Sequence, residues 1–330
     1  MIFRQFFDNI SCTYTYLISS GKGREALIID PVLEKTDQYI QLLNQLDLKL
    51  VKVIDTHIHA DHISGIAELR DRTKCITLMG DHAPADIVSM TVKDNEDITI
   101  ENIKLKSLYT PGHTDDSYSF VMSDRVFTGD TLLIKGTGRT DFQNGNSYDQ
   151  YNSIFERLLK LPNKTFIYPA HDYKGENVST IEEEKFFNPR LQVSSAQEYA
   201  ILMDNLNLDN PKLMDVAVPK NKSMGINYDI QKKFNGISFD ELQNLIINKN
   251  HILIDLREES EIFKKSSLDK SINIPYLKLH DYIKKNLTLL KSKNIIFYCA
   301  VGERSTLAIQ ICKSYQLNNF YHLIGGLNNI

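Results

Sequence analysis

Three histidines and an aspartate lie within the six residues HIHADH, at positions 57 to 62. They follow the apolar run LKLVKVIDT (48–56), which predicts a buried strand. Because side chains alternate along a strand, we expect His57, His59 and Asp61 to project to one side, with His62 opening the next turn. Imidazole and carboxylate groups at this density are typical of a metal site, and the motif by itself allows one ion or two.

Three further residues of the same chemical type occur singly downstream. Each ends a predicted strand: His113 in TPGHT, Asp130 in FTGD and His171 in YPAHD. Strand ends followed by turn-forming residues are where functional sites are usually built. A single histidine is more often a buried residue with ordinary hydrogen bonds, but seven ligand-type residues in this arrangement favour a metal centre.

The pattern HxHxDH followed by His, Asp and His resembles the metallo-β-lactamase superfamily over residues 1 to about 225. In that superfamily the seven residues can hold two zinc ions, with Asp130 as the bridge, and such sites activate water for hydrolysis. One function that this resemblance implies is therefore a binuclear zinc thioesterase of the glyoxalase II type.

Three other segments resemble a narrower branch, the persulfide dioxygenases. They are GTGRTDFQ (136–143), AHDYKG (170–175) and FFNPRL (186–191). Members of this branch bind a single iron, and the resemblance implies one Fe(II) per chain, held by His57, His113 and Asp130. Two imidazoles and one carboxylate leave positions open for substrate and dioxygen. The remaining four residues would then orient the ligands without binding a second metal: His59, Asp61, His62 and His171.

Candidate substrate-binding residues come from the same segments. Arg139 could donate charge-assisted hydrogen bonds to a carboxylate or to a nascent sulfur oxyanion, or could simply pair with Asp141. Tyr173 and Arg190 are candidates for holding a glutathione-like substrate, with structural roles as the alternative.

A second chemical motif is CAVGERS (299–305), between a predicted strand and a predicted helix. The N–H groups at a helix N-terminus and a nearby arginine both favour a cysteine thiolate, which can attack sulfane sulfur. Inward-pointing N–H groups of the loop would stabilise the resulting persulfide. The alternative is that Cys299 is a buried apolar cysteine like Cys12 or Cys312.

The order LIDLREESEIF, INIPYL, FYCAVGERS and HLIGGL resembles a rhodanese domain over about 95 residues. This resemblance implies that Cys299 is the sulfur-accepting nucleophile of a sulfurtransferase. Its substrate cradle would consist of Ala300, Val301, Gly302, Glu303 and Arg304.

The elements that position these motifs divide into two groups. Residues 1 to about 172 alternate short strands with a few helices, which predicts a layered α/β sandwich. Beyond residue 236, strands alternate with helices, which predicts a small α/β domain with a parallel sheet. The two resemblances imply that these are the αββα sandwich of the metallo-β-lactamases and a rhodanese-like domain. Pro, Lys, Asn and Gly gather in VPKNKSMGINYDIQKKFNG (218–236). We therefore expect a first domain at 1–225, a linker at 226–235 and a second domain at 236–330.

Composition excludes several classes of protein. Of the 330 residues 42% are apolar and 24% charged, and the net charge is −4, so we expect no nucleic-acid partner. No apolar run approaches the roughly 20 residues of a membrane span, and the N-terminus predicts a strand pair and not a signal peptide. The four cysteines show no CxxC spacing, which favours a reducing cytoplasm. A homo-oligomer is left open.

The two resemblances share an intermediate, because a rhodanese forms or consumes persulfides and a persulfide dioxygenase oxidises them. They imply oxidation of glutathione persulfide, or a related thiol persulfide, by O2 to sulfite and thiol, a sulfide detoxification. They also imply sulfur transfer between thiosulfate, Cys299 and a thiol, in a direction left undetermined. Besides the zinc thioesterase, a non-enzymatic persulfide carrier or sensor using Cys299 stays as an alternative.

Overall fold

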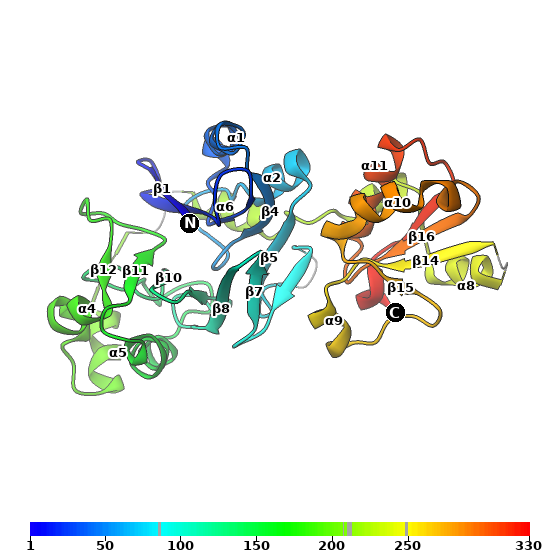
Figure 1. The fold of residues 1–330 in the computed structure, drawn as a ribbon. Helices are drawn as coiled ribbons and strands as arrows, with labels where there is room; N and C mark the ends of the chain where they lie inside the picture. Colours follow the sequence, from blue (N-terminus) through cyan, green and yellow to red (C-terminus); the bar gives the residue numbers. More distant parts are fainter. Residues whose placement is uncertain (85–86, 207, 210–212, 248–249) are drawn as a thin grey trace. The chain divides into compact units, whose positions relative to one another are not determined.

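Two six-stranded sheets pack face to face in the first part of the chain (Figure 1). The computed structural model describes residues 1–84, 87–206, 208–209, 213–247 and 250–330. Within these ranges, residues 1–85 and 91–224 form one unit, and residues 86–90 and 225–330 form another. The sequence-based prediction of two modules with different sheets is confirmed.

The first sheet has the order β1-β2-β3-β4-β5-β6. Its strands are β1 (Ile2–Asp8), β2 (Thr13–Ser19), β3 (Glu25–Ile29), β4 (Lys49–Ile54), β5 (Ile76–Gly80) and β6 (Met90–Val92). The first three strands are antiparallel, including the strand pair predicted at the N-terminus, while β3, β4 and β5 run parallel. The short η1 (Leu33–Lys35), α1 (Thr36–Gln45) and α2 (Ile66–Thr73) connect these parallel strands.

The second sheet has the order β12-β11-β10-β9-β8-β7. Its strands are β7 (Asp97–Ile100), β8 (Ile103–Tyr109), β9 (Tyr118–Val121), β10 (Arg125–Gly129), β11 (Phe166–Pro169) and β12 (Ser179–Thr180). The helices of this half are α3 (Ser147–Asn152), α4 (Ile181–Phe187), α5 (Ala196–Asp204) and α6 (Met214–Asn221), with short turns η2 (Ser153–Arg157), η3 (Leu158–Lys160) and η4 (Pro189–Leu191). Residues 147–160 therefore form a short α-helix followed by a π and a 3₁₀ segment.

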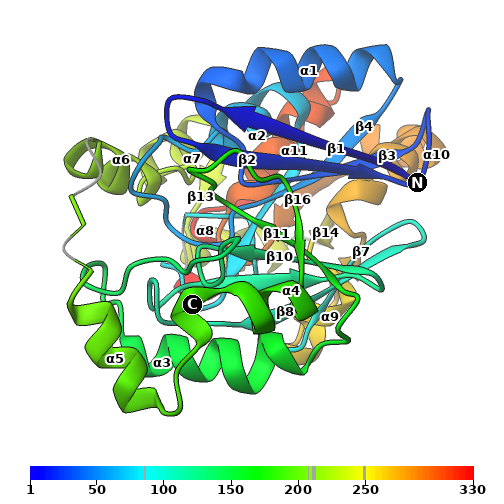
Figure 2. The same ribbon diagram turned by 90° about the vertical axis from the view of Figure 1, so that its left-hand side faces the viewer.

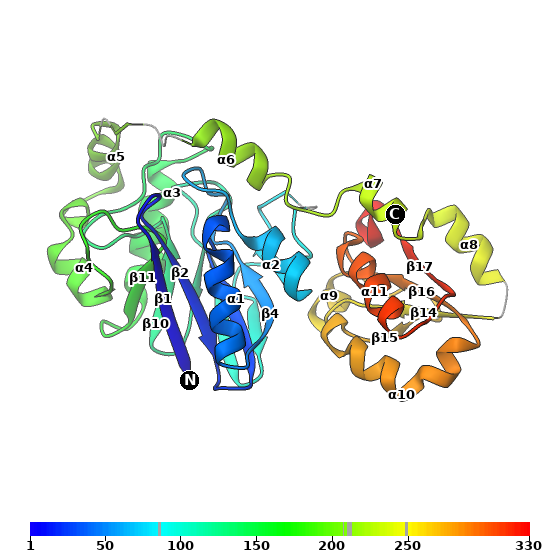
Figure 3. The same cartoon turned by 90° about the horizontal axis from the view of Figure 1, so that it is seen from above.

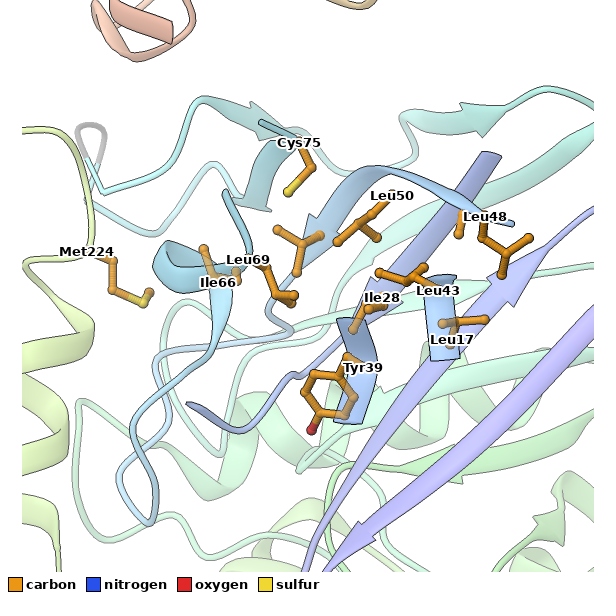
Figure 4. Close-up of a cluster of buried hydrophobic side chains, with 12 residues drawn as sticks. Leu17, Ile28, Tyr39, Leu43, Leu48, Leu50, Ile66, Leu69, Cys75 and Met224 are labelled. Carbon is orange, nitrogen blue, oxygen red and sulfur yellow. The ribbon is translucent and has the colours of Figure 1, made fainter. Parts of the chain in front are cut away.

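Four layers result, with α1 and α2 outside the first sheet and α3, α4 and α5 outside the second (Figure 2). Figure 4 shows the apolar layer under the first pair of helices, where Tyr39 and Leu43 of α1 face Leu17 and Ile28 of the strands. An i, i+4 spacing places Tyr39 and Leu43 on one helix face, and burying a side chain of this size contributes roughly 1.5–3 kcal/mol. This architecture is the αββα sandwich expected from the sequence.

Aromatic rings between the sheets hold the strand ends on which the ligand-type residues sit. Tyr16 of β2 lies 5.0 Å from the Phe127 ring and 5.5 Å from the Tyr168 ring, measured between centroids. Its hydroxyl donates to the Pro169 carbonyl at 2.5 Å. The carboxyl ends of β10 and β11 are thereby fixed against the first sheet.

The second unit contains a five-stranded parallel sheet of order β13-β17-β16-β14-β15. The strands are β13 (Gly236–Ile237), β14 (His251–Asp255), β15 (Ile272–Asn273), β16 (Asn294–Tyr298) and β17 (Phe320–Leu323). The helices are α7 (Tyr228–Lys233), α8 (Phe239–Ile247), α9 (Glu259–Lys264), α10 (Leu279–Lys291) and α11 (Glu303–Ser314), with η5 (Tyr276–Lys278) and η6 (Gly326–Asn329). α10 and α11 lie together on one face of this sheet (Figure 3).

Residues 226–235, predicted as a linker, contain α7 and cluster with the second unit. Gln231 of α7 is buried, and its amide donates to the carbonyls of Ile226 and Val301 while its oxygen accepts from the Gly325 N–H at 2.8 Å. The stretch looked like a linker because of its polar composition, but its side chains make long-range hydrogen bonds. Among the described residues, none of the helices has the length and apolar character needed to cross a membrane.

Candidate metal centre and cysteine loop

The HIHADH motif lies in an irregular loop, because β4 ends at Ile54 and α2 begins only at Ile66. Strand alternation therefore does not position residues 57, 59 and 61, although the centroids of the His57 and His59 rings lie 4.2 Å apart. His57 groups with two downstream residues, whereas His59 and Asp61 group with His62. Once the strand ends, side-chain directions depend on hydrogen bonds from distant segments, which the spacing does not encode.

Asp30 is the first of these distant partners. This fully buried carboxylate accepts from the Thr56 N–H at 2.7 Å and lies 3.2 Å from His59 Nε2. Burial raises the pKa of Asp30 to about 6, despite the opposing effects of His57 and the Thr56 hydrogen bonds. Asp30 was not singled out in the sequence because a lone aspartate after a strand carries no motif.

Asp116 and Asn221 complete the support of the loop. The Asp116 carboxylate accepts from the Ile58 N–H at 2.9 Å. The Asn221 side chain donates to the carbonyls of His59 and His62, both at 2.9 Å, from a position 159 residues or more further along the chain. These hydrogen bonds fix the loop, which is the arrangement that a preorganised metal site needs.

The first cluster consists of His57, His113 and Asp130, all buried, with one potential ligand atom of each within 4.8 Å of the others. These are the three residues that the sequence resemblance assigned to iron. They come from the ends of three different strands, β4, β8 and β10. Burial is the main cause that lowers the pKa of His57, which keeps its imidazole in the neutral form that binds metals.

Hydrogen bonds fix which nitrogen of each histidine is free. His57 Nδ1 lies 2.9 Å from the Thr56 hydroxyl, which itself donates to Asp30, so Nδ1 is the donor of that pair. His113 Nδ1 donates to the Arg139 carbonyl at 2.8 Å. Both rings therefore leave the Nε2 lone pair available, as metal-binding histidines do.

One carboxylate oxygen of Asp130 is hydrogen-bonded to a histidine, and the other is available to a metal. Its Oδ1 lies 2.6 Å from His171 Nδ1, while its Oδ2 lies 3.6 Å from His113 Nε2. Burial raises the pKa of Asp130, but His171 and the other histidines outweigh this effect and hold it below its ordinary value. Two imidazole nitrogens and one carboxylate oxygen are thus a donor set that fits a single divalent transition metal.

The second cluster consists of His59, Asp61 and His62. Asp61 Oδ2 lies 2.9 Å from His62 Nδ1 and 2.8 Å from His171 Nε2. His171 therefore uses both ring nitrogens on carboxylates, one from each cluster. Within the described residues, His59 Nδ1 and His62 Nε2 are buried without a hydrogen-bond partner, which is the feature that keeps a second ion as an alternative.

Thr13 of β2 lies against this second cluster and was missed in the sequence. Its hydroxyl is 3.0 Å from His171 Nε2, 3.1 Å from Asp61 Oδ2 and 3.3 Å from His62 Nδ1. A hydroxyl on an N-terminal strand gives no recognisable signal, and only the pairing of the sheets brings it here.

Gly138 lies directly behind the first cluster, with no room for a side chain. A Cβ at this position would lie 2.2 Å from the Asp130 carbonyl oxygen and 2.8 Å from His113 Nδ1. We expect Gly138→Ala to lower metal affinity by about 10- to 100-fold, because His113 must move, and to cost about 1–3 kcal/mol of stability. Metal titration and thermal unfolding of the metal-free protein measure both effects.

Gly136→Ala is the matched control, because a Cβ there meets its nearest atom at 3.9 Å. It should bind metal like the wild type. Equal affinities for the two alanine variants would contradict the role of Gly138.

A cavity of about 220 Å³ opens beside the first cluster. His113, Asp130 and His171 line one wall, while apolar residues and four cationic side chains line the rest. The apolar residues include Leu133, Ile134, Phe142 and Leu208, and the cationic residues are Lys135, Arg139, Lys174 and Arg190. The two lysines were not foreseen in the sequence, because exposed lysines are common and neither belongs to a motif that pointed to binding.

The three predicted substrate residues differ in what they do in the structure. Arg139 forms a two-pronged ion pair with Asp141, at 2.5 and 2.6 Å, and donates to the Asp209 carbonyl, so the pairing alternative holds for its side chain. Its contribution to the first cluster is the main-chain carbonyl that receives His113. The Tyr173 ring is 69% exposed and stacks parallel to that of His171. Arg190 lines the cavity and donates to the carbonyl and the hydroxyl of Thr137.

Cys299 follows β16 directly and is fully buried. The loop reaches α11 through Gly302, whose φ of 86° is one that non-glycine residues rarely adopt. The carbonyls of Cys299 and Ala300 accept from the N–H groups of Leu327 and Asn328, both at 2.9 Å, so the GGL turn braces the predicted cradle.

The two charged residues of the cradle face partners inside the unit. Arg304 is fully buried, and its Nη atoms form a two-pronged pair with Glu261, each at 2.6 Å. The Glu303 carboxylate is also buried and accepts from the Ile226 N–H at 3.3 Å. Glu303 was predicted to bind substrate, but this contact gives it a structural role in holding the start of the second unit.

Comparisons with known proteins agree with the two halves of the molecule. The sequence matches the family model "Metallo-beta-lactamase superfamily" over residues 13–87 and 77–171 and the model "Rhodanese-like domain" over residues 238–330. Persulfide dioxygenase ETHE1 of Mus musculus is 43% identical over 229 residues, which cover 68% of this chain and 89% of the relative. A probable hydroxyacylglutathione hydrolase of Schizosaccharomyces pombe is 31% identical over 237 residues, 61% of this chain and 90% of the relative.

A solved structure also resembles part of this chain. The crystal structure of ETHE1 from Myxococcus xanthus is 48% identical to this chain, with a TM-score of 0.66. It covers 68% of this chain and 100% of that chain. This likeness does not extend over the whole chain, and the family model identifies the rhodanese-like domain at residues 238–330.

Proposed function

Because the chain belongs to the persulfide dioxygenase family of the metallo-β-lactamase superfamily and carries a C-terminal rhodanese-like domain, we propose that it oxidises glutathione persulfide, or a related low-molecular-weight persulfide. The products are sulfite and the free thiol. A single iron(II) held by His57, His113 and Asp130 serves this reaction, and Cys299 transfers sulfane sulfur.

The observation that carries the proposal of one metal is the hydrogen bond between Asp130 Oδ1 and His171 Nδ1. A carboxylate that binds two ions through separate oxygens needs both of them, but here one oxygen is occupied by an imidazole. His171 is occupied in turn by Asp61 at its other nitrogen. These contacts support a site with three protein ligands and open positions, which suits a non-haem iron(II) oxygenase.

The overall reaction consumes one persulfide, one O2 and one water, and gives one thiol and one sulfurous acid, which ionises to sulfite. When bound, iron(II) would supply the redox chemistry by which O2 oxidises the terminal sulfur. The residues of the chain bind and orient. His171 holds the Asp130 carboxylate, the Arg139 carbonyl holds the His113 ring, and the apolar side chains of the cavity limit the access of water to the terminal sulfur.

The cavity walls support an anionic substrate. Glutathione carries two carboxylates, and Lys135, Lys174 and Arg190 all line the cavity. Since Arg139 is paired with Asp141, Arg190 is the better candidate of the two arginines for a carboxylate.

This assignment predicts the effect of Arg190→Met. Loss of one charge-assisted hydrogen bond, worth about 1.5–3 kcal/mol, should raise the KM for glutathione persulfide by at least about tenfold, with kcat little changed. Steady-state oxygen uptake measures both constants. Arg4→Met, on the exposed edge strand β1, is the control and should leave both unchanged. An Arg190 variant with unchanged KM would show that the carboxylates bind elsewhere.

In the second unit, Cys299 would accept sulfur from thiosulfate or from a persulfide. The rhodanese-like domain supports this transfer, and so does the position of Cys299 between β16 and the N-terminus of α11. The transfer could supply persulfide to the iron site, or combine the sulfite product with sulfane sulfur to give thiosulfate. We also propose a reducing cytoplasmic location, since all four cysteines are free.

Metal analysis of anaerobically purified protein, combined with oxygen uptake on addition of glutathione persulfide, tests the proposal. We expect about one iron per chain and uptake that depends on persulfide. Two zinc ions per chain, hydrolysis of S-lactoylglutathione and no oxygen uptake would contradict the proposal and favour the thioesterase. His59 Nδ1 and His62 Nε2 are the atoms that a second zinc would use.

A further inference from the structure

Two buried side chains connect Cys299 to the opposite side of its loop. Ser305 lies in the first turn of α11, and His322 lies in β17; both are fully buried. The Cys299 Sγ is 3.8 Å from Ser305 Oγ, and Ser305 Oγ is 3.2 Å from His322 Nδ1. The thiol, the hydroxyl and the imidazole therefore form a continuous hydrogen-bonded chain.

The hydrogen bond at the far end of this chain sets the tautomer of His322. His322 Nε2 lies 2.9 Å from the Gln231 main-chain oxygen, which can only accept, so Nε2 carries a hydrogen. Burial lowers the pKa of His322, so at neutral pH the ring is uncharged and Nδ1 presents a lone pair. The Ser305 hydroxyl lies within donor distance of two acceptors, the Gly302 carbonyl at 3.0 Å and His322 Nδ1 at 3.2 Å. When its hydrogen turns to Nδ1, the Ser305 oxygen can accept from the thiol.

We propose that His322, acting through Ser305, is the proton acceptor that converts the Cys299 thiol to the thiolate for sulfur transfer. The proposal rests on the sulfur-transfer function proposed above. In the step, the Cys299 proton moves to Ser305 Oγ while the Ser305 hydroxyl proton moves to His322 Nδ1. The ring becomes an imidazolium, and Ser305 then donates to the thiolate.

The following step balances without a further reactant. The thiolate attacks the outer sulfur of thiosulfate, the new Sγ–S bond forms, and the S–S bond to the sulfonate sulfur breaks, so sulfite leaves with the electron pair. Cys299 becomes a persulfide anion, which can recover the proton from His322 by the same route. With a thiol persulfide as donor, the leaving group is the thiolate of that donor.

Arg304 is the charged residue of the cysteine loop whose electrostatic surroundings include Cys299. Arg304 of α11 is paired with Glu261 of α9, its Nε has no hydrogen-bond partner among the described residues, and Cys299 and Glu258 add to the effects that raise its pKa. Around His322, the hydrogen-bonding neighbours are neutral: Gln231, Ser305, Thr306 at 3.5 Å, and the main chain of Leu323. The imidazole is thus the basic group beside Ser305 that can take up the proton of the thiol.

The test follows the alkylation of Cys299 by iodoacetamide as a function of pH in the full-length protein, quantified on the peptide that contains Cys299. The variants are Ser305→Ala and His322→Gln. We expect the acid limb of the profile to move upward by about one pH unit in both, which makes alkylation at neutral pH about tenfold slower. The rates should converge with that of the wild type at high pH, where the thiol ionises unaided.

Two controls separate this role from a packing role. Ser305→Thr keeps the hydroxyl and should retain the wild-type limb. Ser314→Ala removes a hydroxyl from the end of the same helix, where it bonds only to the Ile311 carbonyl, and should also retain it. A rate that falls by the same factor at every pH in the Ser305→Ala and His322→Gln variants, or that does not change, overturns the proposal.

The rate of thiosulfate-to-glutathione transfer, measured in parallel, separates this proposal from the proposed function. Shifted alkylation limbs in a protein that transfers no sulfur would support the proton relay and overturn the sulfur-transfer function. Active sulfur transfer, with the wild-type pH profile of alkylation in the Ser305→Ala and His322→Gln variants, would support the sulfur-transfer function and overturn the proton relay.

Discussion

Replacing Asp130 with asparagine should abolish metal binding and persulfide-dependent oxygen uptake, whereas the same change at Asp61 should leave about one iron per chain. Both carboxylates bond to His171, Asp130 through Nδ1 at 2.6 Å and Asp61 through Nε2 at 2.8 Å. Asparagine keeps the shape of each side chain, so the pair of variants compares the two positions with little change in packing.

The two variants should differ in metal content because only Asp130 offers an oxygen to the first cluster. Asp130 Oδ2 faces His113 in the cluster that also contains His57, and an amide nitrogen in its place has no lone pair for a metal. Asp61 orients His171, and the loss of such a partner typically costs about 10- to 100-fold in affinity or activity. We therefore expect Asp61→Asn to lower oxygen uptake within that range, and Asp130→Asn to reduce it further, to background.

Metal content by elemental analysis and oxygen uptake give the two readouts, and far-ultraviolet circular dichroism of the metal-free proteins checks that both variants fold. If wild-type protein carries two metal ions and Asp61→Asn carries one, the second cluster is a real metal site. That result would overturn the single-iron proposal and favour the binuclear alternative.

Replacing Cys299 with serine should remove sulfur transfer and leave the oxidation of added glutathione persulfide intact. A hydroxyl at this position is neither ionised at neutral pH nor an effective nucleophile towards sulfur, so thiosulfate-to-thiol transfer should fall by at least about 10³-fold. Oxygen uptake should stay within about twofold of the wild type, because His57, His113 and Asp130 belong to the other unit.

Cys312→Ser provides the matched control for this prediction. Cys312 is also buried and lies on α11, and burial raises the pKa of its thiol to about 12, so it is protonated at neutral pH. Its replacement should preserve both activities. Loss of oxygen uptake in Cys299→Ser would instead show that persulfide must pass through Cys299, as a carrier function requires.

Much of the site is predictable from the sequence because its chemistry depends on residue types that are costly to bury without a role. HIHADH with His113, Asp130 and His171 predicts a metal centre, and the structure brings six of these seven residues into two clusters that His171 joins. CAVGERS between a strand and a helix predicts the cysteine loop, and β16 and α11 confirm that placement. The two sheets of the first unit and the parallel sheet of the second also follow from hydrophobic periodicity.

Other features depend on contacts between segments that are distant in the sequence. Asp30, Asp116 and Asn221 fix the loop after β4 and so decide which ligand-type residues share a cluster, but none of these three residues carries a motif.

For the same reason, only the structure shows that Arg139 is held by Asp141, that residues 226–235 brace the Cys299 loop through Gln231, and that Ser305 connects Cys299 to His322. The sequence by itself determines which groups are available for chemistry, because residue type sets their charge and ligand properties. The tertiary structure decides which atoms remain free to react, because the hydrogen bonds that occupy the others join segments that the sequence keeps far apart.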